Sequence, residues 1–133
     1  MPHKIEYRVP YADTDQMGVV YYANYLEYFE RSRTEMLRSA GLPYRKLEEL
    51  GYYLPVSEAT CKYLGSAKYD DLLTFCSRVT EIKGVRLVIE SEVWRNDELL
   101  VKGYVVLVSV NRDKKVIRMP QMLIDACEKY MEK

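Results

Sequence analysis

The sequence predicts an α+β fold in which a five-stranded antiparallel sheet packs against one long helix. Three observations lead to this prediction. A long amphipathic segment follows an acidic turn near the N-terminus, five other segments have the residue pattern of strands, and short turns connect most of them. Because 133 residues suffice for one domain with a substantial core and are too few for two, we expect a single domain over residues 1–133.

The long helix is expected to begin near residues 23–25 and to end before Gly41. Asn24 is the expected N-cap, with Glu27 three residues later. Gly41 followed by Pro43 ends the helix. Helical spacing predicts an inner face made of Leu26, Phe29, Arg33, Met36, Leu37 and Ala40, with Tyr25 and Tyr28 at its flank.

The remaining segments alternate or are continuously apolar, as strands do. We expect strands at residues 3–10, 56–64, 72–82, 85–95 and 99–110, a helical turn at 44–49 and a C-terminal helix at 120–130. Asn96 and Asp97 provide the turn of a hairpin. Since one helix cannot cover both faces of such a sheet, another copy of the chain should bury the remaining apolar surface.

Composition and charge exclude several classes of function. Lys plus Arg and Asp plus Glu number 20 each, so no overall charge points to nucleic acid or to a membrane surface, and no apolar run approaches membrane-spanning length. Cys61, Cys76 and Cys127 lack metal-ligand spacing and are expected as buried thiols in a reducing, cytoplasmic setting without a metal. With His3 as the single histidine, a Ser-His-Asp or Cys-His site is not expected.

Two aspartates in the turn before the helix are the best candidates for chemistry. Asp13 and Asp15 flank Thr14. Such a pair commonly forms a turn and compensates the helix dipole, and spacing alone favours that role. Alternatively, one aspartate acts as a nucleophile or general base, while free backbone N–H groups at the helix start polarise a carbonyl oxygen. These two parts together are sufficient for ester or thioester hydrolysis.

Other charged residues have less specific patterns. Glu30 lies at the border of the apolar helix face, where a structural pair with Arg31 or Arg33 is favoured over catalysis. Five basic residues either bind a phosphate-bearing ligand or are ordinary surface charges: Lys62, Lys68, Arg86, Arg95 and Lys102.

Residues 11–41 combine several features in a fixed order. An Asp-x-Asp sequence is followed three residues later by Gly18, then by an aromatic run and a helix that carries Phe-Glu-x-x-Arg from Phe29 to Arg33. Asp70 and Asp71 follow Tyr69 further on. With these features the chain resembles, over essentially its whole length, the 4-hydroxybenzoyl-CoA thioesterase-like hotdog family, and within it the YbgC-type acyl-CoA thioesterases.

The resemblance implies a hotdog fold, with the sheet wrapped around the helix. It also implies homodimers that join edge to edge, usually pair into homotetramers, and form their active sites at the dimer interface. The implied activity is hydrolysis of an acyl-CoA to a free acid and coenzyme A, without a cofactor. Asp15 takes the position of the catalytic aspartate, and the backbone N–H of Tyr22 takes that of the group that polarises the thioester carbonyl.

One position departs from the pattern, and alternatives stay open. Many YbgC-type members have a histidine where this chain has Tyr22, so no imidazole role transfers, although the backbone donor does. Tyr11 and Glu30 remain candidates for contact with the substrate, and Tyr11 is also placed to bond Asp15 or a water. The lack of a suitably placed histidine argues against a hotdog dehydratase. A non-catalytic module that binds acyl-CoA or acyl carrier protein remains possible, as does acyl carrier protein as the thioester carrier.

Overall fold

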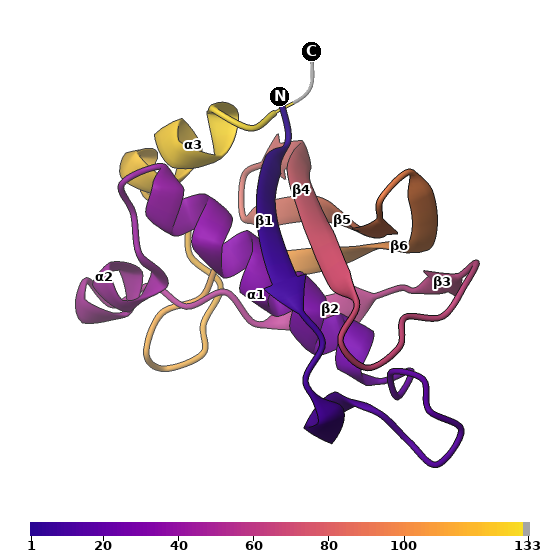
Figure 1. Ribbon diagram of the computed structural model, residues 1–133. Helices are drawn as coiled ribbons and strands as arrows, with labels where there is room; N and C mark the ends of the chain where they lie inside the picture. The colour runs from indigo at the N-terminus through magenta and orange to yellow at the C-terminus, as the bar shows by residue number, and fades with distance from the viewer. Residues whose placement is uncertain (132–133) are drawn as a thin grey trace.

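The fold is a curved antiparallel sheet wrapped around one long helix (Figure 1). The computed structural model describes residues 1–131. Five strands follow one another in the order β1 (His3–Arg8), β4 (Leu72–Lys83), β5 (Arg86–Arg95), β6 (Glu98–Val108) and β2 (Val56–Ala59), and a two-residue strand, β3 (Lys62–Tyr63), also pairs with β6. The predicted sheet and central helix are therefore confirmed, with one additional short strand.

The central helix α1 (Asn24–Ser39) buries Phe29, Met36 and Leu37 as predicted, but its buried stripe is shifted toward the flank. Tyr25 and Tyr28 are buried in the core, whereas Leu26, which was expected inside, is 42% exposed. Both tyrosine hydroxyls find polar partners: that of Tyr25 accepts the Ala67 N–H at 3.1 Å, and that of Tyr28 donates to Asp13 at 2.7 Å. These bonds remove the cost of burying a phenol, so the helix can turn its tyrosines inward.

The predicted cap of this helix is wrong. Asn24 is the first helical residue and Ala23 is the N-cap, without a side-chain hydrogen bond. The side chain of Asn24 instead donates to the backbone carbonyl of Asp13 at 3.0 Å. The helix start is therefore tied to the preceding acidic turn.

The predicted strand at residues 56–64 is broken into β2 and β3. Around the break, the Thr60 N–H donates to the Tyr104 carbonyl at 2.9 Å, and the Tyr104 N–H returns a bond to the Thr60 hydroxyl at 3.2 Å. The Thr60 carbonyl lies directly over Gly103 of β6, so the chain leaves the regular line of the strand at this point. All four residues of β2 are exposed.

The two other helices are short. The predicted helical turn is confirmed as α2 (Tyr44–Glu49), and the C-terminal helix is α3 (Gln121–Glu128), which is shorter than expected at both ends. Cys76 and Cys127 are buried as predicted and Cys61 is partly buried; all three are free thiols. None of the helices in residues 1–131 is long and apolar enough to cross a membrane.

The core consists of two hydrophobic clusters. The tyrosine-rich cluster lies at the end of the molecule that carries the acidic turn: Val9, Val20, Tyr25, Tyr28, Phe29, Ala67, Leu73, Phe75, Val93, Leu100 and Val101. The second cluster joins α1 to α2 and α3 through residues such as Met36, Leu47, Leu87, Ile89 and Leu123. Three buried serines, Ser32, Ser77 and Ser91, are joined by hydrogen bonds between their side chains.

Candidate active site

The segment between β1 and α1 folds into a tight hairpin that carries both aspartates. The Asp15 N–H donates to the Val19 carbonyl at 2.9 Å. The Tyr21 N–H donates to the Asp13 carbonyl at 3.0 Å. Gly18 closes the turn with a φ of +79°, a conformation that residues with a side chain rarely adopt. The acidic arm is thereby fixed against the arm that leads into the helix.

The hairpin is attached to the loop that precedes β4. The Val20 N–H donates to the Ala67 carbonyl at 2.8 Å, and Val19 pairs with Lys68. Since Ala67 also donates to the Tyr25 hydroxyl of α1, this loop contacts both the hairpin and the helix.

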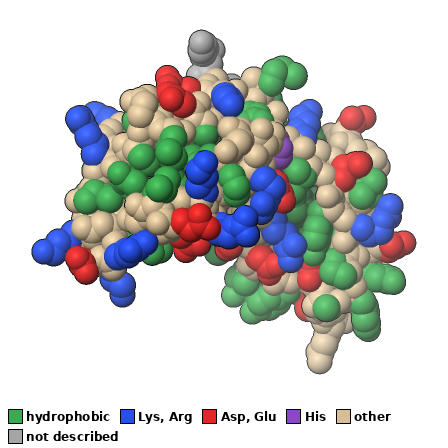
Figure 2. All heavy atoms as spheres, turned by 90° about the vertical axis from the view of Figure 1, so that its left-hand side faces the viewer, with side chains coloured by type: hydrophobic (Ala, Val, Ile, Leu, Met, Phe, Trp, Pro, Cys, Tyr) green, Lys and Arg blue, Asp and Glu red, His purple; other side chains and the backbone are tan. Residues whose placement is uncertain are grey.

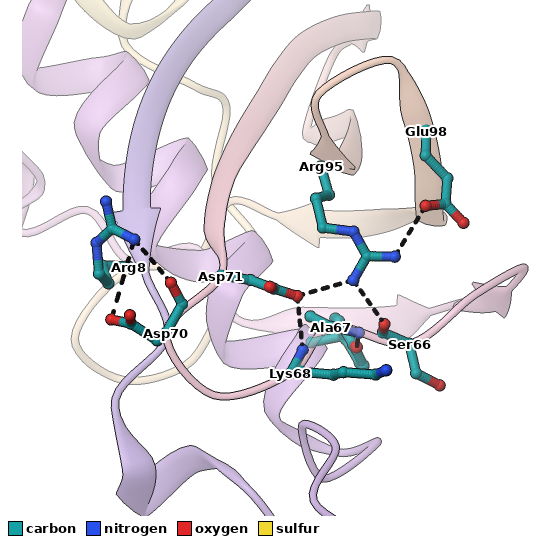
Figure 3. A network of polar contacts seen from close by, with 9 residues as sticks. Arg8, Ser66, Ala67, Lys68, Asp70, Asp71, Arg95 and Glu98 are labelled. Carbon is teal, nitrogen blue, oxygen red and sulfur yellow. Dashed lines mark hydrogen bonds and ion pairs between the residues drawn. The ribbon is translucent and has the colours of Figure 1, made fainter.

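Arg95 holds this loop in place (Figure 3). Its guanidinium donates to the Ser66 carbonyl at 3.2 Å, to the Asp71 carboxylate at 2.7 Å and to the Glu98 carboxylate at 2.8 Å. Burial opposes ionisation of Asp71, but the N–H of Lys68 and the charge of Arg95 together bring the pKa of that carboxyl below its ordinary value. With its donors directed to three protein acceptors, Arg95 has a structural role, and nothing in this geometry supports phosphate binding by it.

Asp15 lies at the exposed end of the hairpin. Its Oδ1 accepts the backbone N–H of Met17 at 2.8 Å, which is the turn-forming bond that aspartate commonly makes. Its Oδ2 has no hydrogen-bond partner within residues 1–131. The turn-forming role and an available carboxylate oxygen therefore coexist in one side chain.

Tyr22 lies where the hairpin enters α1. Within residues 1–131, the backbone N–H groups of Tyr22 and Ala23 donate to no other group, whereas the next N–H, that of Asn24, bonds to the Tyr21 carbonyl at 2.9 Å. The carbonyl of Tyr22 accepts the hydroxyl of Tyr63 at 3.1 Å, which fixes this peptide from its other side. The Tyr22 N–H is thus unbonded within the described residues, and its use as a donor to the substrate stays a prediction.

Exposed aromatic side chains surround the hairpin. Hydrophobic side chains gather at the lower end of the face shown in Figure 2, where Figure 1 places the hairpin. Tyr11 is 76% exposed and its ring contacts that of Tyr69, with centroids 5.6 Å apart. The ring of Tyr22 contacts those of Tyr21 and Tyr63. In the described part of the chain no hydrogen bond joins the Tyr11 hydroxyl to Asp15, so the role of Tyr11 stays a prediction.

Glu30 lies apart from these groups. It is exposed on α1 and lines a cavity of about 260 Å³ together with Arg33 and Tyr44, but neither Asp15 nor Tyr22 lines that cavity. Within residues 1–131 no ion pair or hydrogen bond joins Glu30 to Arg31 or Arg33, although the charge of Glu30 raises the pKa of Arg33 against the effect of burial.

The two arginines have other surroundings. Arg31 pairs with Glu27 at 2.8 Å, and burial lowers the pKa of Arg33. The structure therefore brings Asp15 and Tyr22 into one hairpin and leaves Glu30 outside it.

The residue pattern did not reveal the partners of Asp13. Tyr7 of β1 and Tyr28 of α1 both donate to its Oδ2, at 2.8 and 2.7 Å. The available signal was weak: an inward strand position for Tyr7, and a helical position three residues after another tyrosine for Tyr28.

Comparison with known proteins identifies the family. A family model described as the thioesterase superfamily matches residues 17–102, a range that contains Tyr22 and Glu30 and begins just after Asp15. The chain belongs to the thioesterase superfamily. Membership of this superfamily confirms the prediction of a thioester hydrolase at the level of the family.

Individual members of the superfamily resemble this chain in sequence and in fold. It is 41% identical over 108 residues to an acyl-CoA thioesterase YbgC of Haemophilus influenzae, covering 80% of this chain and 79% of that one. A probable thioesterase from Bartonella henselae is similar with a TM-score of 0.86 and 34% identity, covering 90% of this chain and all of that chain (100%). A hypothetical protein from Aquifex aeolicus has a TM-score of 0.92 and 28% identity, with coverage of 95% and 99%. The hotdog fold expected from residues 11–41 is confirmed.

Proposed function

We propose that this chain hydrolyses acyl-CoA thioesters to a free acid and coenzyme A, with Asp15 as the nucleophile or general base. One observation carries the proposal. A single hairpin presents Asp15, with one carboxylate oxygen unbonded within residues 1–131, and the approach to α1, where the Tyr22 N–H has no internal acceptor. The similarity to a relative named acyl-CoA thioesterase supplies the substrate class.

The reaction needs an attacking group and a donor for the developing oxyanion. The thioester carbonyl oxygen accepts the N–H of Tyr22, which stabilises the negative charge that develops on it. Asp15 either attacks the carbonyl carbon, giving a mixed anhydride that water then cleaves, or removes a proton from the attacking water. In both routes the carbon–sulfur bond breaks and coenzyme A leaves as a thiolate, which takes up a proton from solvent.

The reaction needs little acid assistance, because a thiolate is a good leaving group. This suits a chain whose single histidine is at position 3. Replacement of the subfamily's histidine by Tyr22 leaves the backbone donor in place, since the N–H does not depend on the side chain. Tyr11 and Glu30 are retained as candidates for substrate contact.

The proposal includes assembly into homodimers and then homotetramers. β2 forms one edge of the sheet, all its residues are exposed, and no strand pairs with its outer edge in the part of the chain that the structure describes. An open strand edge of this kind is normally covered, and a second β2 supplies matching backbone groups. We further propose that the protein is cytoplasmic and that residues 1–133 form one domain.

The test measures thiol release from short aliphatic, long aliphatic and aromatic acyl-CoAs, and from the same acyl groups on acyl carrier protein. Asp15→Asn should lower the rate at least about 100-fold. The asparagine Oδ1 can still accept the Met17 N–H, so the turn is kept and the charge is lost. Asp97→Asn, in the exposed turn between β5 and β6, is the matched control and should retain the wild-type rate.

Near-normal activity of Asp15→Asn would contradict the assigned mechanism. If the wild-type chain binds acyl-CoA but releases no thiol from any of these substrates, it is a binding module instead. The pattern of rates identifies the preferred acyl group and its carrier.

A further inference from the structure

Asp13 is bonded by donors from three parts of the chain. Its Oδ2 accepts the Tyr7 hydroxyl of β1 at 2.8 Å and the Tyr28 hydroxyl of α1 at 2.7 Å. Its backbone carbonyl accepts the Tyr21 N–H and the side-chain amide of Asn24, both at 3.0 Å. One residue thus links the first strand, the central helix and the segment that leads to the Tyr22 donor.

The two tyrosines that bind Asp13 are themselves held in place. The rings of Tyr7 and Tyr28 both stack on Phe75 of β4, with centroids 5.2 and 4.9 Å apart, respectively. The guanidinium of Arg31 lies over the Tyr7 ring, 5.2 Å from its centroid. Tyr28 is fully buried, with 0% of its surface exposed. The hydroxyls therefore meet Asp13 from packed rings with little freedom to move.

Both hydroxyls stay protonated at neutral pH. Burial, and then the hydrogen bond to Asp13, raise the pKa of Tyr7 to about 12 and also raise the pKa of Tyr28. A carboxylate that accepts two such donors at one oxygen is bound more rigidly than Asp15, whose carboxylate accepts a single bond within residues 1–131. The two aspartates of the Asp-x-Asp sequence are thus in different environments.

We propose that Asp13 is a positioning residue, which fixes the hairpin so that Asp15 and the N–H of Tyr22 keep the separation that thioester hydrolysis requires. This inference rests on the proposed function. Asp13 acts through the four hydrogen bonds that it accepts, two at its carboxylate and two at its backbone carbonyl, and does not touch the substrate. Its negative charge is not required, because any acceptor that receives both hydroxyls can hold the turn.

The test compares Asp13→Ala with Asp13→Asn. Asp13→Ala should lower kcat about 10- to 100-fold through misplacement of the reacting groups, with KM changed less than about 3-fold. Asp13→Asn should restore kcat to within about 3-fold of wild type, because an amide oxygen can accept both hydroxyls. Oδ1 of Asp13 has no partner within residues 1–131, so the amide nitrogen can occupy its place.

A matched control distinguishes a loss of kcat caused by misplaced reacting groups from one caused by lower stability of the fold. Tyr130→Phe removes a tyrosine hydroxyl that bonds Ser39 at 2.8 Å, at the other end of α1, and should change kcat less than about 2-fold. If Asp13→Ala lowers the melting temperature but keeps the wild-type kcat at a temperature where it is folded, Asp13 is structural and the inference is overturned. If Asp13→Asn is as inactive as Asp15→Asn, Asp13 takes part in the chemistry itself and the inference is again overturned.

Amide hydrogen exchange tests the positioning role without relying on enzymatic activity, so its result does not depend on the proposed function. In Asp13→Ala, the amides of Asp15 and Tyr21 should exchange at least about 10-fold faster, since the hairpin loses its anchor. Unchanged exchange would overturn the inference even if the wild-type chain released no thiol. If Asp15→Asn is inactive while Asp13→Ala keeps wild-type kcat, the positioning role alone fails.

Discussion

The hydroxyl of Ser32 on α1 lies 2.5 Å from the hydroxyl of Ser77 on β4, in the buried core. Ser77 in turn bonds Ser91 of β5 at 2.9 Å, and Ser91 pairs with Gly103 of β6. The sheet therefore presents a row of small residues on three neighbouring strands.

Ser77→Ala should destabilise the fold by about 1–3 kcal/mol, because it leaves the hydroxyls of Ser32 and Ser91 without the partner they have in the structure. Replacing all three serines by alanine should cost less than the single change, since no hydroxyl is then left unsatisfied. Chemical denaturation of both variants makes the comparison. A triple variant less stable than Ser77→Ala would show that the serine bonds make a net favourable contribution.

Gly103→Ala should prevent normal folding or cost more than about 3 kcal/mol. An added Cβ would overlap the backbone carbonyl of Thr60 and would lie 2.9 Å from Cε2 of Phe29, so the backbone itself would have to move. The yield of folded protein and its denaturation midpoint measure the effect.

Gly84→Ala is the control for Gly103→Ala. Gly84 has a φ of +62° but open space around its Cβ position, so alanine there should cost about 1 kcal/mol. Equal losses in the two variants would mean that steric overlap at Gly103 is relieved at little cost.

Because of the two tyrosines bonded to Asp13, the free energy of unfolding should fall as the pH becomes strongly alkaline. The folded-state pKa of Tyr7 is raised to about 12 and that of Tyr28 is raised too, while an unfolded tyrosine ionises near 10. For a raised pKa, the stabilising contribution is complete below about pH 10 and is lost as pH rises through the folded value. Denaturation at pH 8, 10 and 11 should show a declining stability that is shallower in the double variant Tyr7→Phe, Tyr28→Phe. Parallel pH profiles would contradict this assignment.

The helix shows how far residue spacing could predict the fold. Periodicity and Gly41 located α1 to within a few residues. Spacing could not decide between a stripe containing Leu26 and one containing Tyr25 and Tyr28, because hydrophobicity favours leucine inside. The choice depends on hydroxyl partners contributed by residues 13 and 67, which are distant from the helix in the sequence.

The candidate site shows the same difference between local and distant contacts. Asp15 and Tyr22 lie in one local hairpin, so a pattern within a few residues could place them together. The broken strand at Thr60 and the bonds around Asp13 arise from contacts between distant segments. The local pattern contains no sign of the break and only a weak sign of the bonds. Glu30, which stays a candidate for substrate contact, lines a cavity to which neither Asp15 nor Tyr22 contributes.

The two clusters of the core have a consequence for how the molecule unfolds. Four long elements contribute to both: β4 places Phe75 in the tyrosine-rich cluster and Val79 in the second, and α1, β5 and β6 divide their residues in the same way. Neither cluster can lose these elements without exposing the other, so the two should melt together in a single cooperative transition. α2 and α3 belong to the second cluster alone and are free to open locally, which confines partial opening to the elements that do not carry the hairpin.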